Sequence, residues 1–328
     1  MLVLRISLLL TIFLCVKGKV HPIKHHKAGH HHRHFNKCPC GVSDFAEERI
    51  INGKTVKDYR KYPWIVCIIH DKSMAPWGTC GGALISPTFV LTAAHCFRRY
   101  LKKPTPFHLK VKNLRIGLLG KDKYRPAKTV LVKQVIIHPE YSLSKKGNDV
   151  ALLELQDSIP CTLYSKPICV NPPKSILTVG NIVHIAGFGR TEMFKKQQKL
   201  REGTSRIVDS KECSSKYLGF LPSRELCLVT DKRTRVCKGD SGNTVFLQHK
   251  HTFYSVGVVN YGDILCELKN PSVFVRTDAY FHFIREHVKD LPNSHRDNLL
   301  LLRLMSRILL VLFLRRTEII PCLLCPEF

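Results

Sequence analysis

The sequence has few acidic residues, and this shortage limits the partners that it can attract. It carries 25 Asp and Glu against 52 Lys and Arg, a formal net charge of +27 at pH 7. A field of this sign attracts sulfated glycans, anionic membrane surfaces or acidic proteins. The alternative is a solvated basic surface without a dedicated partner. Nucleic acid is not expected as a partner, because the sequence contains no recognisable nucleic-acid-binding module.

Neither apolar end of the chain is long enough to cross a bilayer, which needs about 20 apolar residues. Residues 1–18 have instead the features of a secretory signal peptide: an early Arg5, a short apolar run and the cleavage site "VKG". The tail, residues 291–328, is apolar but interrupted by Arg303 and Arg307. Two interpretations of it stay open: an amphipathic helix that lies on a membrane or a partner, and an accidental extension of the reading frame.

The chain also lacks an Asn-x-Ser/Thr sequon with an allowed middle residue, so N-glycosylation is not expected. Cysteines, in contrast, are numerous, with fourteen in the chain. The signal peptide predicts a secreted, extracellular protein, and disulfides form readily in that environment. Most of the cysteines are therefore expected to be paired.

Residues 19–49 are interpreted as a pro-segment without a core of its own. Its first part, "KVHPIKHHKAGHHHRHFNK", contains seven histidines. Such a tract can bind zinc or copper loosely, but a solvated, pH-dependent basic tract is the favoured interpretation, and no metal site is predicted. "CPC" at 38–40 then begins a tethered stretch.

Residues 50–290 have the pattern of an all-β domain. Apolar runs of four to eight residues, such as "PWIVCIIH" and "DVALLEL", alternate with turns. One helix is expected at the end of the domain, where "TDAYFHFIREHVKDL" places apolar residues on one stripe. Thr277 or Asp278 is its expected N-cap.

Four separated segments carry a resemblance to a known family. They are "RIING" (49–53), "LTAAHC" (91–96), "NDVALLEL" (148–155) and "GDSG" (239–242). In this order and at these spacings they resemble the motifs of the trypsin/chymotrypsin-like serine peptidases. The resemblance implies two antiparallel six-stranded β-barrels with a C-terminal α-helix. It also implies an endopeptidase that hydrolyses a protein or peptide substrate without a cofactor.

The resemblance assigns a role to each residue of these motifs. Ser241 attacks the carbonyl, and His95 takes the serine proton, since a serine hydroxyl is a poor nucleophile at neutral pH. Asp149 fixes the tautomer of His95 and stabilises the imidazolium. The backbone N–H groups of Gly239 and Ser241 form the oxyanion hole.

A second implied feature is activation by proteolysis. Cleavage after Arg49 by another trypsin-like protease would give Ile50 a free amine. Burying that cation requires an anion, and Asp240 matches the family's partner for it. The chain as written is therefore expected to be an inactive zymogen.

Most disulfides also follow from the resemblance. Cys38 or Cys40 is expected to reach Cys169, and Cys161 is an open partner for the other one. Cys67, in the middle of a strand, is expected to be a buried thiol. The other implied pairs are Cys80–Cys96, Cys213–Cys227 and Cys237–Cys266, and one family bridge has lost both cysteines, to Val183 and Leu247.

The primary specificity pocket departs from the family pattern. Its floor, six residues before the serine, is Arg235, where an aspartate would select basic side chains. The other positions are Val236 at the wall, Lys238 near the rim and Ser272 in place of a small glycine. A narrowed, positive pocket of this kind would pair with Glu or Asp and repel Lys or Arg. The alternative is that Glu267 neutralises Arg235 and the pocket is occluded.

Two further substitutions affect catalytic competence. Asn243 replaces a glycine and is expected to adopt the left-handed backbone conformation, which Asn tolerates best. Asn260 replaces a serine and is expected to donate to Asp149, while Tyr261 and Gly262 continue the edge that pairs with the substrate backbone. The alternative function is therefore a catalytically weak homologue that acts as a basic glycan- or surface-binding protein.

The loop that holds calcium in some relatives reads "GKDKYRPAK" (120–128), which has too few carboxylates for that ion. Together with "FRRYLKK" (97–103) and "MFKKQQKLRE" (193–202), it is expected to form an exosite for a polyanion such as a sulfated glycan.

Overall fold

The computed structural model describes nine stretches of the chain, all within the unit Lys37–Phe328. They are residues 38–44, 54–70, 80–101, 106–120, 122, 125–189, 199–230, 239–262 and 270–293.

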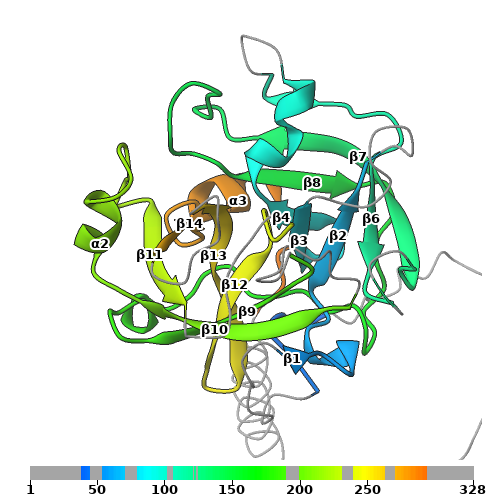
Figure 1. Cartoon of the computed structure of the whole chain (residues 1–328). Helices are drawn as coiled ribbons and strands as arrows, with labels where there is room; N and C mark the ends of the chain where they lie inside the picture. Colours follow the sequence, from blue (N-terminus) through cyan, green and yellow to red (C-terminus); the bar gives the residue numbers. More distant parts are fainter. Residues whose placement is uncertain are drawn as a thin grey trace, which may run out of the picture. The chain divides into compact units, whose positions relative to one another are not determined.

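The first half of the described chain forms one closed antiparallel sheet (Figure 1). Its strand order is β5-β7-β6-β2-β3-β4-β8, and β7 also pairs with β8, so six strands close into a barrel and β5 lies outside the ring. The strands are β2 (Ile65–Ile69), β3 (Cys80–Ser86), β4 (Phe89–Thr92), β5 (His108–Leu109), β6 (Arg115–Leu118), β7 (Lys128–Ile137) and β8 (Ala151–Leu155).

A second sheet, built from β1 and the strands of the second half, repeats this arrangement. The order is β1-β10-β11-β14-β13-β12-β9, and β10 also pairs with β9, so again six strands close and β1 lies outside the ring. The strands are β1 (Lys54–Thr55), β9 (Ile182–Gly187), β10 (Arg201–Ile207), β11 (Glu225–Thr230), β12 (Thr244–His249), β13 (Thr252–Tyr261) and β14 (Ser272–Arg276). The expected pair of six-stranded antiparallel barrels is thus confirmed.

Helices are short and few among the described residues. They are the 3-10 helices η1 (Tyr59–Lys61), η3 (Ala94–Tyr100) and η4 (Lys174–Ile176), and the α-helices α2 (Ser210–Ser214) and α3 (Phe281–His287). None of them has the length and apolar character needed to cross a bilayer.

The helix expected at the end of the domain is α3, but its expected N-cap is wrong. Tyr280 occupies the N-cap position without a capping side-chain bond. Thr277 instead donates its hydroxyl to the carbonyl of Ser255, and Asp278 pairs with Arg276. Both side chains serve the turn that leaves β14, so the helix starts later than the sequence pattern suggests.

An aromatic cluster joins the two barrels. Trp64, just before β2, lies edge-on to Phe246 of β12, with ring centroids 5.3 Å apart, and 5.2 Å from Phe253 of β13. Tyr62 lies 5.1 Å from Phe246. Because large aromatic rings bury much apolar area and prefer tilted contacts, this cluster fixes the first barrel against the second.

The second barrel also explains the lost disulfide. Val183 of β9 and Leu247 of β12 are both buried in its apolar core. Two apolar side chains thus occupy the positions that a disulfide would have linked. Because both cysteines are replaced, no unpaired thiol remains at either position.

A buried ion pair contacts the aromatic cluster through Tyr62. Lys61 Nζ lies 3.1 Å from Glu202 Oε2, and the side chains are only 9% and 8% exposed. Tyr62 donates its hydroxyl to the same carboxylate at 2.6 Å. Such a pair is costly to break, because removing one partner leaves the other charge buried without compensation.

We expect Lys61→Met to destabilise the fold by about 3–5 kcal/mol, since Glu202 would lose its cation. Lys133→Met is the matched control: Lys133 also pairs with a glutamate, Glu154, but is 60% exposed. Exposed pairs contribute about 1 kcal/mol or less. Denaturant unfolding with the disulfides intact measures both, and equal losses in the two variants would contradict the buried-pair account.

Candidate active site

Strand pairing in the first barrel brings His95 and Asp149 together. The antiparallel strands β4 and β8 place Thr92 opposite Ala151. The segment that follows β4 and carries His95 therefore lies at the same end of the strand pair as the segment that precedes β8 and carries Asp149. His95 Nδ1 lies 2.7 Å from Asp149 Oδ2, and the backbone N–H of His95 donates to Asp149 Oδ1, also at 2.7 Å. Since an ionised carboxylate only accepts, Nδ1 is the donor, which leaves Nε2 as the ring atom that can take a proton.

The charge of Asp149 sets the protonation of His95. Burial lowers the pKa of His95, but the charge and the hydrogen bond of Asp149 outweigh it, and the net effect raises that pKa above its ordinary value. The carboxylate therefore stabilises the imidazolium, the form that a general base reaches after it accepts a proton.

The turn that carries Ser241 lies directly against the first barrel. Gly81 of β3 donates its N–H to the Ser241 carbonyl at 2.9 Å, and Gly242 donates to the Val259 carbonyl at 3.0 Å. Gly242 has φ +78, and a Cβ there would lie 3.2 Å from Cys96 Sγ. Only glycine fits, and this close approach places Ser241 beside the segment that holds His95.

Asn243, contrary to expectation, does not adopt the left-handed conformation. The residues with positive φ in this turn are the glycines Gly239 and Gly242. The Asn243 side chain is buried and fills the space left by two glycines: a Cβ on Gly81 would lie 1.8 Å from its Oδ1, and one on Gly187 would lie 2.9 Å from its Nδ2. Asn243 is thus accommodated by the absence of side chains opposite it.

The Asp240 carboxylate fills the space that two glycines leave beside it. It is buried, and its Oδ1 accepts the backbone N–H of Gly189 at 2.8 Å. A Cβ on Gly189 would lie 1.9 Å from Asp240 Oδ2, and one on Gly187 would lie 2.1 Å from Oδ1. The carboxylate is therefore held by backbone in a space that side chains cannot enter.

The edge formed by Asn260, Tyr261 and Gly262 rests on a buried glutamate that the sequence reasoning missed. Asn260 Nδ2 donates to Glu225 Oε1 at 3.3 Å, and the Tyr261 hydroxyl donates to Oε2 at 3.2 Å. The expected bond from Asn260 to Asp149 is therefore wrong. A charged residue opening the apolar run "ELCLVT" was the signal in the sequence that could have revealed Glu225.

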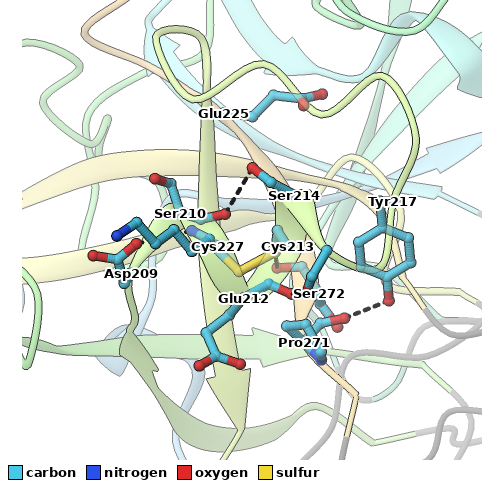
Figure 2. Close-up of a disulfide and its surroundings, with 12 residues drawn as sticks. Asp209, Ser210, Glu212, Cys213, Ser214, Tyr217, Glu225, Cys227, Pro271 and Ser272 are labelled. Carbon is cyan, nitrogen blue, oxygen red and sulfur yellow. Dashed lines mark hydrogen bonds between the residues drawn. A yellow bond between two sulfur atoms is a disulfide. The ribbon is translucent and has the colours of Figure 1, made fainter.

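Ser272 lies against this edge. Its Oγ would be 2.8 Å from a Cβ on Gly262, so the serine occupies space beside the glycine. The adjacent Pro271 carbonyl accepts the Tyr217 hydroxyl at 2.6 Å (Figure 2). Figure 2 also shows the Cys213–Cys227 disulfide, which joins α2 to β11 next to this segment.

Several predicted residues lie outside the described residues. These are Arg49 and Ile50 of the activation site, the pocket residues Arg235, Val236 and Lys238, Glu267, and the pair Cys237 and Cys266.

Four disulfides are present among the described residues. Two of them, Cys80–Cys96 and Cys213–Cys227, are the pairs that the resemblance implies. The alternatives left open for "CPC" are decided as Cys40–Cys169 and Cys38–Cys161. Cys67 forms no disulfide, but it is only partly buried, in contrast to the expectation.

One cluster of metal-type ligands occurs among the described residues. The side chains of Cys80, His95 and Cys96 lie within 4.8 Å of one another. Because the two cysteines are bonded to each other, neither offers a thiolate. This cluster therefore does not fit a metal.

The sequence of this chain is similar to those of known proteins. The family model Trypsin matches residues 50–284. Phenoloxidase-activating factor 3 of Holotrichia diomphalia is 30% identical over 265 residues, which cover 76% of this chain and 75% of that protein. Melanization protease 1 of Drosophila melanogaster is 30% identical over 279 residues (76% and 68%). Human transmembrane protease serine 5 is 28% identical over 256 residues (76% and 54%).

The chain therefore belongs to the trypsin family of serine proteases.

We expect Gly81→Ala to destabilise the protein by about 1–3 kcal/mol, because the new methyl group would overlap Asn243 Oδ1. The double variant Gly81→Ala, Asn243→Gly should recover most of that loss, since it removes the overlapping atoms. Denaturant unfolding of the two single variants and the double variant measures the coupling. Additive losses would show that Asn243 does not depend on the glycine opposite it.

Proposed function

We propose that the protein is a secreted serine endopeptidase, made as a zymogen, with His95, Asp149 and Ser241 as its catalytic triad. The observation that carries the proposal is the pair of 2.7 Å contacts between His95 and Asp149, beside the turn that presents Ser241. The relatives that are named as proteases support the same chemistry.

In this mechanism His95 Nε2 accepts the proton of Ser241 as the oxygen attacks the substrate carbonyl. The imidazolium, stabilised by Asp149, then donates the proton to the leaving amine, and water repeats the sequence on the acyl-enzyme. The N–H groups of Gly239 and Ser241 stabilise the oxyanion. Each such donor typically contributes about 10²–10³ in rate.

Activation is proposed to follow cleavage after Arg49 by a different, trypsin-like protease. The new amine of Ile50 would pair with Asp240, which is buried and accepts the backbone N–H of Gly189. The pro-segment, residues 19–49, would stay attached after the cut, because two disulfides join it to the protease domain through Cys161 and Cys169.

Acidic specificity is proposed for the primary pocket. Arg235 would form its floor and pair with a Glu or Asp side chain, while basic side chains would be repelled. The position of Ser272 against Gly262 supports a narrowed entrance. If Glu267 neutralises Arg235 instead, the pocket is closed to acidic and to basic substrate side chains.

The direct test is cleavage of a peptide library by the protein after its Arg49 bond has been cut, with Ser241→Ala as the control. We expect cuts after Glu or Asp that are lost in the variant. Cuts after Lys or Arg would contradict the proposed acidic specificity but would support the proposed endopeptidase activity. If cleavage is absent although sequencing confirms the Ile50 terminus, the binding homologue becomes the better interpretation.

A polyanion-binding surface is proposed as a second property. Strands β5, β7 and β6 are neighbours, and residues 106–120 and 125–137 contain no acidic residue. Among their exposed cations, Arg125 pairs with Asp122 and Lys133 with Glu154. Lys110, Lys112, Arg115 and Lys128 have no acidic partner among the described residues. Of the expected exosite segments, 97–103 contributes the exposed Arg98 and Arg99.

We expect Lys112→Ala with Arg115→Ala to lower the salt concentration at which the Ser241→Ala protein elutes from heparin, because fewer counterions are released on binding. Lys174→Ala with Lys211→Ala, exposed cations of the second barrel, is the control with the same change of net charge. Equal shifts in both double variants would mean that only net charge matters, which would contradict a defined surface.

A further inference from the structure

A lysine lies over the aromatic edge of the candidate active site. Lys146 Nζ is 4.6 Å from the ring centroid of Tyr261 and 5.8 Å from that of Tyr217. The two rings are nearly perpendicular, with centroids 5.5 Å apart. An ammonium held over two aromatic faces is attracted by both ring quadrupoles, which gives this long side chain a preferred position.

The Tyr261 ring is itself fixed by a hydrogen bond to a buried carboxylate. The Tyr261 hydroxyl donates to Glu225, which also accepts the backbone N–H of Leu221 at 2.9 Å. Glu225 is only 2% exposed, so its carboxylate relies on these donors. Tyr261 is thus held between a buried carboxylate on one side and an ammonium on the other.

The loop that carries Lys146 is fixed as well. Gly147 has φ +96, and a Cβ there would lie 2.6 Å from Leu221 Cδ1, so the loop packs tightly on the loop before β11. The next residue, Asn148, donates its backbone N–H to the Tyr280 hydroxyl and accepts that hydroxyl at its side-chain oxygen, both at 3.0 Å. Lys146 therefore precedes Asp149 on a segment with little freedom.

The ammonium group of Lys146 is accessible to a ligand. The side chain is exposed, and no carboxylate pairs with it among the described residues, where Glu225 is engaged by Tyr261, Asn260 and Leu221. The buried carboxylate of Glu225 interacts electrostatically with Lys146 but forms no ion pair with it. An exposed ammonium that is positioned by aromatic rings and has no ion-pair partner among the described residues is suited to a carboxylate supplied from outside.

We propose that Lys146, seated on Tyr261 and Tyr217, binds an acidic side chain of the substrate on the N-terminal side of the cleaved bond. This inference rests on the proposed function, in which the substrate backbone pairs along Tyr261 and Gly262. It assigns selection of a second acidic residue to a group separate from Arg235.

The test compares matched peptides that carry Glu or Gln at each position before the cleaved bond. In the activated protein, kcat/KM should favour Glu about fivefold at one of these positions, as expected for one largely exposed ion pair. Lys146→Met should abolish the preference, Lys146→Arg should retain it, and Lys146→Glu should reverse it so that Gln is favoured over Glu. Lys145→Met, at the exposed neighbouring residue, should leave it unchanged.

A second readout separates this inference from the proposed activity. Fluorescence anisotropy with the Ser241→Ala protein measures binding of the same Glu and Gln peptides without any cleavage. If no variant cleaves peptides but the Glu preference in binding depends on Lys146, the proposed function fails, while Lys146 is still shown to bind an acidic side chain. If neither assay shows a Glu preference, or if Lys146→Met and Lys145→Met change it equally, the inference is overturned.

Discussion

The contact between strand β3 and the turn around Ser241 is the constraint on which the site depends. Its backbone bond, from Gly81 N–H to the Ser241 carbonyl, joins the barrel that holds His95 and Asp149 to the barrel that holds the serine. The approach is close enough that neither Gly81 nor Gly242 can carry a side chain. The aromatic cluster around Trp64 then supplies the apolar area that keeps the barrels at this distance. Asn243 shows the same constraint from the other side, because its larger side chain fits only where glycine faces it.

The shortage of acidic residues is more severe at the surface than the composition suggests. Five carboxylates are buried among the described residues, against one buried lysine: Asp122, Asp149, Glu202, Glu225 and Asp240. Each has a structural task, such as orienting His95, pairing with Lys61 or accepting backbone N–H groups. The interior thus contains several carboxylates, whereas nearly all the lysines of the described residues lie at the surface. This uneven division explains how an exposed lysine such as Lys146 can lie near the candidate active site without an ion-pair partner among the described residues.

Much of the fold and of the candidate site could be predicted from the sequence, and the failures share one cause. Short apolar runs predicted an all-β domain, and the resemblance carried by four motifs implied the two barrels. The same resemblance assigned roles to His95, Asp149 and Ser241. Asn243 and Asn260 were misjudged because their partners, Gly81 and Glu225, are far away in the sequence. The N-cap of α3 failed for a related reason, since Thr277 donates to Ser255 of a neighbouring strand. Local chemistry predicts local structure, but contacts across the chain decide which of several hydrogen bonds a polar side chain makes.

The two disulfides of "CPC" have a consequence for damage by other proteases. Cys38–Cys161 and Cys40–Cys169 span 123 and 129 residues, and the segments that they enclose overlap almost completely. A single backbone cut anywhere between Cys40 and Cys161 therefore leaves two pieces that are still joined by at least two covalent links. The strands of the first barrel, β2 to β8, all lie within that interval. A nick there therefore opens the chain without releasing a fragment.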